Sequence, residues 1–341
     1  MAKLRKGRAA RLSDVARAAG VSLATASRAL AGAGLVHPET LGRVREAVAL
    51  LGYVPHGAAR ALASRRSRTL AAVIPTLDNP VFSASTHALQ LRLAEDGYTL
   101  LLASHEYDLG AEVRMVQAFI ERGVDGMLLV GLDHDPAAHR LLQQAGIPYE
   151  LTWAIDASGF HHSLGFSNRR AAAMVAQHLL ELGHRELAVV SGFTAYNDRA
   201  RERVAGVREA LEARGLALAP ELVLETSFSI ASGRRALVEL LGAGRRFTAV
   251  ACGNDILAMG VLIEAAARGI AVPGRLSVAG FDDIDLAAEY TPSLTTVHLP
   301  VAEIGRDAAE RMLARLAGKA VPRVEEVKVE LVVRASTGRP G

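Results

Sequence analysis

The sequence predicts a small all-α head followed by a two-lobed α/β body built on doubly wound parallel sheets. Short capped helical patterns fill residues 12–52, and beyond Thr69 apolar runs alternate with amphipathic stretches in two successive sets. The chain has 341 residues, of which 50% are hydrophobic and 22% are charged. This length can bury more than one core, and the composition excludes disordered and fibrous classes.

The formal net charge of +3 hides two regions of opposite sign. Residues 1–68 hold 13 Lys and Arg against 3 Asp and Glu, a net charge of +10, whereas residues 69–341 hold 26 against 33, a net charge of −7. A basic head on an acidic body indicates a polyanionic partner for the head, either nucleic acid or an anionic membrane surface. No apolar run reaches the ~18 residues of a transmembrane helix, which favours nucleic acid.

The sequence also indicates a cytoplasmic protein. The segment from Met1 to Lys6 leads into charged and polar residues rather than into the apolar core of a signal peptide. Cys252 is the only cysteine, which excludes an internal disulfide and a cysteine-based metal cluster and agrees with a reducing compartment.

The head opens with a capped helix, a glycine turn and a second capped helix, and a third helix follows. Ser13 and Ser22 are the predicted N-caps of the first two, Pro38 suits the first turn of the third, and Gly52 ends it. The very short first turn and the basic charge favour a helix-turn-helix that lays its second helix in the DNA major groove. A small three-helix docking module is the alternative.

The second helix carries the expected base contacts. Leu23, Ala24 and Arg28 are predicted to face outward, and Ala26 and Leu30 inward. Arg28 can pair with a guanine, while Leu23 and Ala24 can contact a thymine methyl. Serine and threonine hydroxyl groups in these helices can also bond phosphates or bases. The expected DNA-contacting residues of the three helices are therefore Ser13, Ser22, Leu23, Ala24, Thr25, Ser27 and Arg28.

Continuous apolar runs joined by stretches of helical length predict parallel strands that are buried on both faces. A break near residues 160–167 divides these runs between two similar lobes. The runs are Leu70–Ile74, Tyr98–Leu102, Gly126–Val130, Leu187–Val190, Thr248–Ala251 and Leu276–Ala279.

Polar residues that follow these runs predict a binding crevice, because ligands of such folds bind at the carboxyl ends of the strands. Carboxylates and guanidinium groups there offer paired, directional hydrogen bonds to a hydroxyl-rich ligand. The residues in question are Asn197, Asp198, Arg199, Arg203, Asp255 and Asp282. A solvated helix face is the alternative for the arginines, and it is our interpretation of Arg201 and Arg208.

The body shows no catalytic pattern: there is no phosphate-binding loop, no His-Glu-x-x-His and no Gly-x-Ser-x-Gly. Asp282, Asp283 and Asp285 could suggest a metal site, but acidic residues after a strand also serve as helix caps or ligand acceptors. His161 and His162 are interpreted as a solvated loop pair. We therefore expect neither an enzyme nor a metal or cofactor site.

The head and hinge resemble those of the lactose/galactose-repressor family of transcriptional regulators. The similar residues are Leu12–Ser22, Thr25–Leu30, Leu51–Pro55 and Ala59–Leu62, and the resemblance continues through Asn79–Phe82, Gly183–Arg185, Gly253–Asp255, Gly280–Asp283 and Arg334–Thr337. Pro148–Trp153 is similar to the gluconate-repressor-like branch, although Ala154 stands where that branch often has Asp.

The resemblance implies roles for individual residues. Ala59 and Leu62 would lie in a hinge helix, with Leu62 wedged into the minor groove, and His56 stands where the family usually has an Asn. Arg203 and Asp282 would contact the effector. Phe82, Trp153 and Phe228 fall at ligand-pocket positions, where aromatic faces stack on sugar rings or bases; a core role is the alternative for Trp153.

The expected domain limits follow from the pattern of apolar runs and helical stretches together with the resemblance to the repressor family. They are a DNA-binding domain at 1–53, a hinge at 54–68 and a periplasmic-binding-protein-like body at 69–335. Within the body we expect a first lobe of about 69–165 and 298–323, and a second of about 166–297 and 324–335.

We therefore expect a homodimeric repressor that binds a near-palindromic operator under the control of a small effector, a sugar, sugar acid or phosphorylated sugar, with no membrane contact. An effector-dependent co-repressed or activating regulator of the same fold is one alternative. A cytosolic solute-binding protein or enzyme with a basic extension is another.

Overall fold

The computed structural model describes residues 10–30, 36–54 and 66–341. The chain divides into two compact units, Met1–Arg68 and Thr69–Gly341, each with its own hydrophobic core. Within the described ranges, no helix is both long enough and apolar enough to cross a bilayer.

The first unit contains α1 (Leu12–Ala18), α2 (Leu23–Leu30) and α3 (Pro38–Leu51). The helices pack on a core of mostly small side chains, which allows short helices to approach closely. This core consists of Val15, Ala19, Ala29, Val44 and Ala47.

The ends of these helices follow the predicted capping with one exception. Ser22 Oγ accepts a hydrogen bond from the Thr25 N–H at 3.1 Å, and α3 ends at Gly52 in the left-handed region, with φ at +57°. The prediction for Ser13 was wrong, because α1 begins one residue earlier, at Leu12. The carboxylate of Asp14 instead accepts from the Arg11 N–H at 3.0 Å, and Ser13 lies exposed in the first turn.

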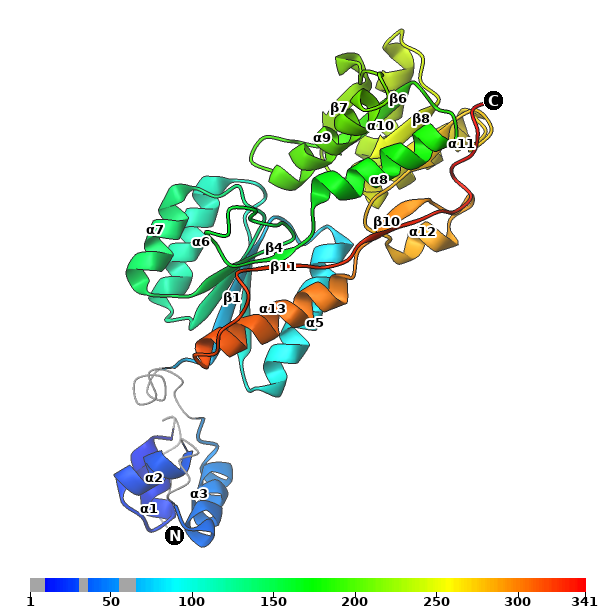
Figure 1. Ribbon diagram of the computed structural model, residues 1–341. Coiled ribbons are helices and arrows are strands. Elements are labelled where there is room, and N and C mark those ends of the chain that lie inside the picture. The colour runs from blue at the N-terminus through cyan, green and yellow to red at the C-terminus, as the bar shows by residue number, and fades with distance from the viewer. Residues whose placement is uncertain (1–9, 31–35, 55–65) are drawn as a thin grey trace. The chain divides into compact units, whose positions relative to one another are not determined.

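The first lobe of the second unit is a parallel sheet with the strand order β11-β5-β4-β3-β1-β2. Helices α5 and α13 cover one face, and α6 and α7 cover the other (Figure 1). The elements are β1 (Thr69–Ile74), α5 (Pro80–Glu95), β2 (Thr99–Ser104), α6 (Leu109–Glu121), β3 (Gly126–Val130), α7 (Pro136–Ala145), β4 (Tyr149–Thr152), β5 (Ser163–Gly165), α13 (Val301–Leu316) and β11 (Val324–Glu326).

The second lobe is a parallel sheet with the order β7-β6-β8-β9. Helices α8 and α9 pack on one face, and α10 and α11 pack on the other. The elements are α8 (Asn168–Glu181), β6 (Leu187–Gly192), α9 (Asp198–Glu212), the 3-10 turn η1 (Pro220–Leu222), β7 (Val223–Thr226), α10 (Ile230–Gly242), β8 (Ala249–Cys252), α11 (Asp255–Ala267), β9 (Ser277–Ala279) and α12 (Asp285–Glu289).

The predicted fold class is confirmed, and each predicted apolar run forms a strand: β1, β2, β3, β6, β8 and β9. The chain passes between the lobes after β5, after β10 (Thr296–His298) and after β11, and β10 pairs with β12 (Glu330–Val332). The expected lobe limit at 323/324 needs correction. β11 still belongs to the first lobe because it pairs with β5 and satisfies the backbone groups of that sheet edge.

Glycines allow the helix pair α10 and α11 to pack closely. A Cβ atom on Gly260 would lie 2.3 Å from the carbonyl oxygen of Ile230, and a Cβ atom on Gly233 would lie 2.3 Å from that of Leu257. Both contacts are to backbone, which cannot rotate away as a side chain can. The two helices are therefore held together at a distance that only glycine permits.

We expect Gly260→Ala to force α10 and α11 apart and to lower the free energy of unfolding by roughly 1–3 kcal/mol, measured as a fall in melting temperature. Gly242→Ala is the matched control, because a Cβ atom there meets nothing within 4 Å; it should be neutral or slightly stabilising. Equal melting temperatures for the two variants would contradict the packing argument.

Candidate functional site

The outward face of α2 carries the side chains that the sequence predicted for DNA contact. Ser22, Leu23, Ala24, Ser27 and Arg28 are exposed, with Leu23 54% exposed. Thr25 is half-buried beside Ser22, whose hydroxyl lies 2.8 Å from its own. Ala26 is fully buried and Leu30 packs against the core, so the predicted inward face is confirmed.

The described part of this unit is also basic on its surface. Exposed arginines outnumber the acidic groups Asp14, Glu39 and Glu46; they are Arg11, Arg17, Arg28, Arg43, Arg45, Arg66 and Arg68. Ser13, also predicted to contact DNA, is exposed in the first turn of α1, whereas His56, Ala59 and Leu62 lie outside the described residues.

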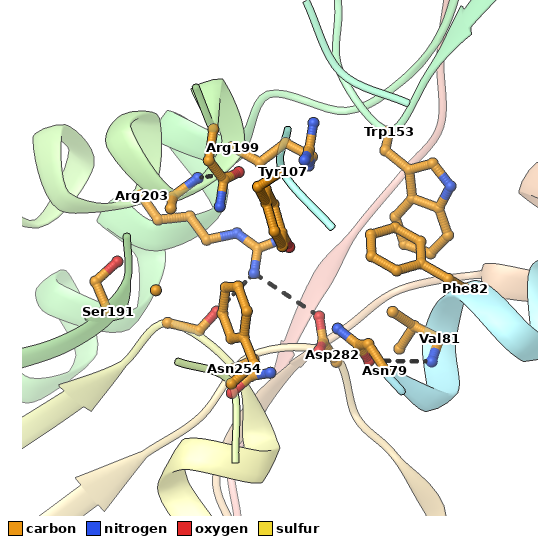
Figure 2. Close-up of a pocket in the computed structure, with 15 residues that line it drawn as sticks. Asn79, Val81, Phe82, Tyr107, Trp153, Ser191, Arg199, Arg203, Asn254 and Asp282 are labelled. Atoms are coloured by element: carbon orange, nitrogen blue, oxygen red, sulfur yellow. Dashed lines mark hydrogen bonds and ion pairs between the residues drawn. The ribbon is translucent and has the colours of Figure 1, made fainter. Parts of the chain in front are cut away.

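A pocket between the two lobes of the second unit lies at the carboxyl ends of strands from both sheets (Figure 2). The start of α5 and the residues after β2 and β4 contribute from the first lobe. The ends of β6 to β9 and the start of α9 contribute from the second lobe. Its lining is Asn79, Val81, Phe82, Tyr107, Trp153, Ser191, Gly192, Asn197, Arg199, Ala200, Arg203, Phe228, Gly253, Asn254 and Asp282.

Arg203 supplies a buried positive charge on one side of this pocket (Figure 2). Its Nε donates to Asn168 Oδ1 at 2.9 Å and its Nη1 to the Gly253 carbonyl at 2.6 Å, while the guanidinium carbon lies 3.7 Å from the centre of the Phe281 ring. Burial lowers the pKa of Arg203 to about 10, so it remains charged at neutral pH. These contacts fix the guanidinium in one orientation.

Asp282 faces Arg203, and Nη1 and Oδ1 lie 3.8 Å apart. This separation is longer than a hydrogen bond, and the second carboxylate oxygen, Oδ2, is buried without a hydrogen-bond partner. Burial raises the pKa of Asp282, an effect that the positive charge of Arg203 only partly offsets. Its backbone is also strained, with φ at +122°.

Two further pocket atoms are buried without hydrogen-bond partners, Ser191 Oγ and Asn254 Nδ2. A buried polar group without a partner costs about 1–3 kcal/mol. Together with Asp282 Oδ2, the pocket thus collects a hydroxyl, an amide donor and a carboxylate acceptor whose bonds remain to be made. Hydroxyl groups, which both donate and accept, have the chemistry that these three atoms lack.

Aromatic rings form the opposite wall and the entrance. The rings of Phe82 and Trp153 meet edge to face at 5.0 Å. Tyr107 of the first lobe lies 6.1 Å from Phe228 of the second. The Phe228 ring packs directly on Gly192, where a Cβ atom would lie 2.0 Å from it. Rings of this kind present flat apolar faces to a sugar or a base.

The inner pocket is narrow. Its cavity volume is about 20 Å³, which is room for one water molecule, whereas the adjoining outer part of the cleft holds about 300 Å³. Tyr107 and Phe228 line both parts. A ligand of sugar size therefore enters the inner pocket only when these rings or the lobes move apart.

Two arginines on α9 bridge the lobes beside the pocket. Arg199 Nη1 donates to the Val130 carbonyl at 3.1 Å, and Gly131 makes room for it, since a Cβ atom there would lie 1.8 Å from that nitrogen. Arg201, interpreted from sequence as solvated, forms a bidentate pair with Asp133 of the first lobe, both distances being 2.8 Å. The two contacts link α9 of the second lobe to the end of β3 and the residues that follow it in the first lobe.

The structure brings together all but two of the predicted effector residues: Phe82, Trp153, Asn197, Arg199, Arg203, Phe228 and Asp282 line the pocket. Asp198 and Asp255 do not. Asp255 is fully buried, and its carboxylate accepts from Thr296 Oγ1 at 2.6 Å and from the Ile284 N–H at 2.9 Å, so it holds the 280–284 loop. The sequence reasoning missed Asn79, Val81, Tyr107, Ser191 and Asn254; the Asn79 and Asn254 motifs were noted only as family resemblance.

The other candidate chemical groups do not line this pocket. Cys252 is buried in β8, and burial raises the pKa of its thiol. Asp283 pairs with Arg334 at 2.6 Å and with His298 at 2.9 Å. His161 and His162 are half-buried rather than solvated. No group of three or more metal-ligating side chains occurs in residues 10–30, 36–54 and 66–341.

Comparison with known proteins gives matches for both units. Residues 11–56 match the family described as bacterial regulatory proteins, lacI family, and residues 176–337 match the periplasmic binding protein-like domain. A transcriptional regulator of Pseudomonas aeruginosa called HTH-type transcriptional regulator GntR is 36% identical over 329 residues, which cover 96% of this chain and 95% of that protein.

Solved structures are similar over nearly the whole chain. A lac repressor dimer bound to operator and the anti-inducer ONPF has a TM-score of 0.85 and 26% identity, covering 97% of this chain and all of the other. The complex of the regulator CelR with cellobiose has a TM-score of 0.72 and 29% identity, covering 96% of this chain and 99% of the other.

The buried carboxyl group predicts a pH dependence of stability. Because burial raises the pKa of Asp282, the folded protein holds this proton more tightly than the unfolded chain does. Stability is then lost as pH rises above the ordinary carboxyl pKa of about 4. Asp282→Asn should raise the melting temperature more at roughly pH 9 than at pH 5, whereas exposed Asp285→Asn should show no such trend. A gain that is independent of pH would contradict the assignment.

Proposed function

This chain belongs to the lacI family of bacterial regulatory proteins, and we propose that it is a cytoplasmic, homodimeric transcriptional repressor controlled by a small molecule in the cleft of its second unit. The exposed face of α2 contacts operator bases, with Arg28 as the reader of guanine, and the surface arginines contact phosphates. The hinge residues proposed to reach the minor groove are Ala59 and Leu62, and His56 is proposed to contact the DNA; the expected limits 1–53, 54–68 and 69–335 stand as the proposed domains.

The effector we propose is a sugar or a sugar acid. The observation that carries this is the convergence of three buried, unpartnered polar atoms on the pocket, opposite the aromatic pair Phe82 and Trp153. Vicinal hydroxyl groups can bond Ser191, Asn254 and Asp282 at once, while the ring face packs on the aromatic wall. The CelR complex with cellobiose provides a precedent in a protein of similar fold.

Control of DNA binding follows from movement of the lobes. The Arg199 and Arg201 contacts favour one closed arrangement, and an effector that binds another arrangement more tightly shifts the population toward it. In a dimer, such a shift changes the spacing of the two heads and so the operator affinity.

The first test concerns the head. Duplexes that the wild-type protein selects from a random pool serve as the operator, and fluorescence anisotropy measures affinity. We expect Arg28→Ala to cost about 1–3 kcal/mol on the selected site, because it removes a guanine contact, and to relax the base preference there. Exposed Arg45→Ala on α3 is the control, with a smaller loss on all sequences. Binding of selected and random duplexes by wild type with equal affinity would sink the regulator proposal.

The second test concerns the cleft. A thermal-shift screen of sugars, sugar acids and nucleobases should yield a stabilising compound, since a ligand at ~100 times its dissociation constant adds roughly 2.7 kcal/mol. Arg203→Gln should abolish that shift while the protein still binds the selected duplex. Arg208→Gln, an exposed arginine on the same helix, should respond as wild type does. A compound that raises the melting temperature of Arg203→Gln as much as that of wild type binds elsewhere, and this result refutes the assignment.

A further inference from the structure

A second cavity lies on the far side of the first lobe from the cleft. Its volume is about 650 Å³, within the range of small-molecule sites. Its walls come from the amino ends of β4, β5 and β11 and from the last turns of α7 and α13, whereas the cleft lies at the carboxyl ends of strands. Its lining includes Tyr149, Phe160, His161, His162, Arg315 and Arg323.

The two arginines of this cavity are held in place by backbone carbonyls. Arg315 Nη1 donates to the Tyr149 carbonyl at 2.6 Å, and Arg323 Nη1 donates to the Phe160 carbonyl at 2.8 Å. Each carbonyl fixes one corner of a guanidinium that has five N–H donors in total. Both cations are therefore oriented without being neutralised by these contacts.

Carboxylates near the cavity match its arginines in number but leave Arg323 without an ion pair among the described residues. Arg311 bonds both Glu150 and Glu325, and Arg315 Nη1 lies 3.4 Å from Glu150 Oε2. Asp156 turns its oxygens to the Ser158 hydroxyl and to the N–H groups of Ser158 and His161. Within the described residues, the Arg323 side chain bonds only the Phe160 carbonyl, so most of its N–H donors are available to a ligand.

His162 provides a buried polar atom that awaits a partner. Its Nδ1 has no hydrogen-bond partner in the structure. Burial and the nearby charges of Arg315 and Arg323 lower its pKa, while a hydrogen bond to the Pro322 carbonyl favours the protonated ring. An anion bound in the cavity offsets the charges of the two arginines and thereby favours the protonated ring of His162. The Nδ1–H of that ring then donates a hydrogen bond to the anion. His161 beside it is fixed by Tyr149, whose hydroxyl lies 2.6 Å from its Nδ1.

We propose that this cavity is a second ligand site, which binds a small organic anion through its phosphate or carboxylate group by means of Arg323, Arg315 and His162. A guanidinium pair with a histidine is suited to such a group because each supplies directional, charge-assisted hydrogen bonds. The exposed ring of Phe160, 65% accessible, offers an apolar rim for the rest of the molecule.

The experiment titrates the full chain with inorganic phosphate by isothermal calorimetry at constant ionic strength. Wild type should bind phosphate, and Arg323→Gln should bind at least about tenfold more weakly, since a charge-assisted bond contributes about 1.5–3 kcal/mol. Arg306→Gln, an exposed arginine on the same α13, should bind as wild type. Arg203→Gln should do so as well, because it lies in the cleft. His162→Gln, whose melting temperature is checked first, should repeat the loss.

Several results would overturn the proposal. Wild-type phosphate affinity in both Arg323→Gln and His162→Gln shows that the cavity holds no anion site. Loss of phosphate binding in Arg203→Gln alone places the anion in the cleft. A fall in duplex DNA affinity in Arg323→Gln with phosphate binding unchanged assigns this arginine to the DNA backbone.

Discussion

The buried guanidinium of Arg203 is the contact on which the second unit depends. It bonds Asn168, the first residue of α8 after the chain has crossed between lobes, and Asn168 Nδ2 donates in turn to the Trp153 carbonyl at 2.9 Å. The same cation lies on the Phe281 ring and faces Asp282. A buried charge is stable only when it is paired or hydrogen-bonded. The contacts of Arg203 therefore hold together the pocket wall at Asp282, the lobe crossing before α8 and the aromatic wall at Trp153. A ligand that contacts this group acts on all three.

The fold could be predicted from the sequence because its strands are buried on both faces and therefore form continuous apolar runs. Much of the pocket could be predicted for a related reason. Parallel strands end at one edge of the sheet, so Arg203 and Asp282, which both follow strands, were expected to lie near each other. Asp255 shows the limit of that rule. It also follows a strand, but as the first residue of α11 it turns its carboxylate toward Thr296 and the Ile284 N–H. Position along the chain does not fix side-chain direction.

The remaining features depend on contacts that sequence spacing does not record. Arg201 is exposed, in agreement with its interpretation as solvated, but its ion pair was not predicted because Asp133 lies 68 residues away in the other lobe. Tyr107 was missed because its place at the entrance follows from a turn in which both Glu106 and Tyr107 have positive φ. β5 and β11 are three residues long and were not among the predicted apolar runs, which is why the last lobe crossing was placed too early.

The narrowness of the inner pocket has a consequence for the rate at which this protein responds. Because Phe228 rests on Gly192 and leaves a cavity of about 20 Å³, a molecule of sugar size must wait for that ring or the lobes to open. At high ligand concentration, the rate of association is then limited by the opening motion and not by diffusion. The measured affinity is reduced by the fraction of time that the pocket spends closed. If the cleft binds the proposed effector, Phe228 governs the rate of its entry as well as the shape of the pocket.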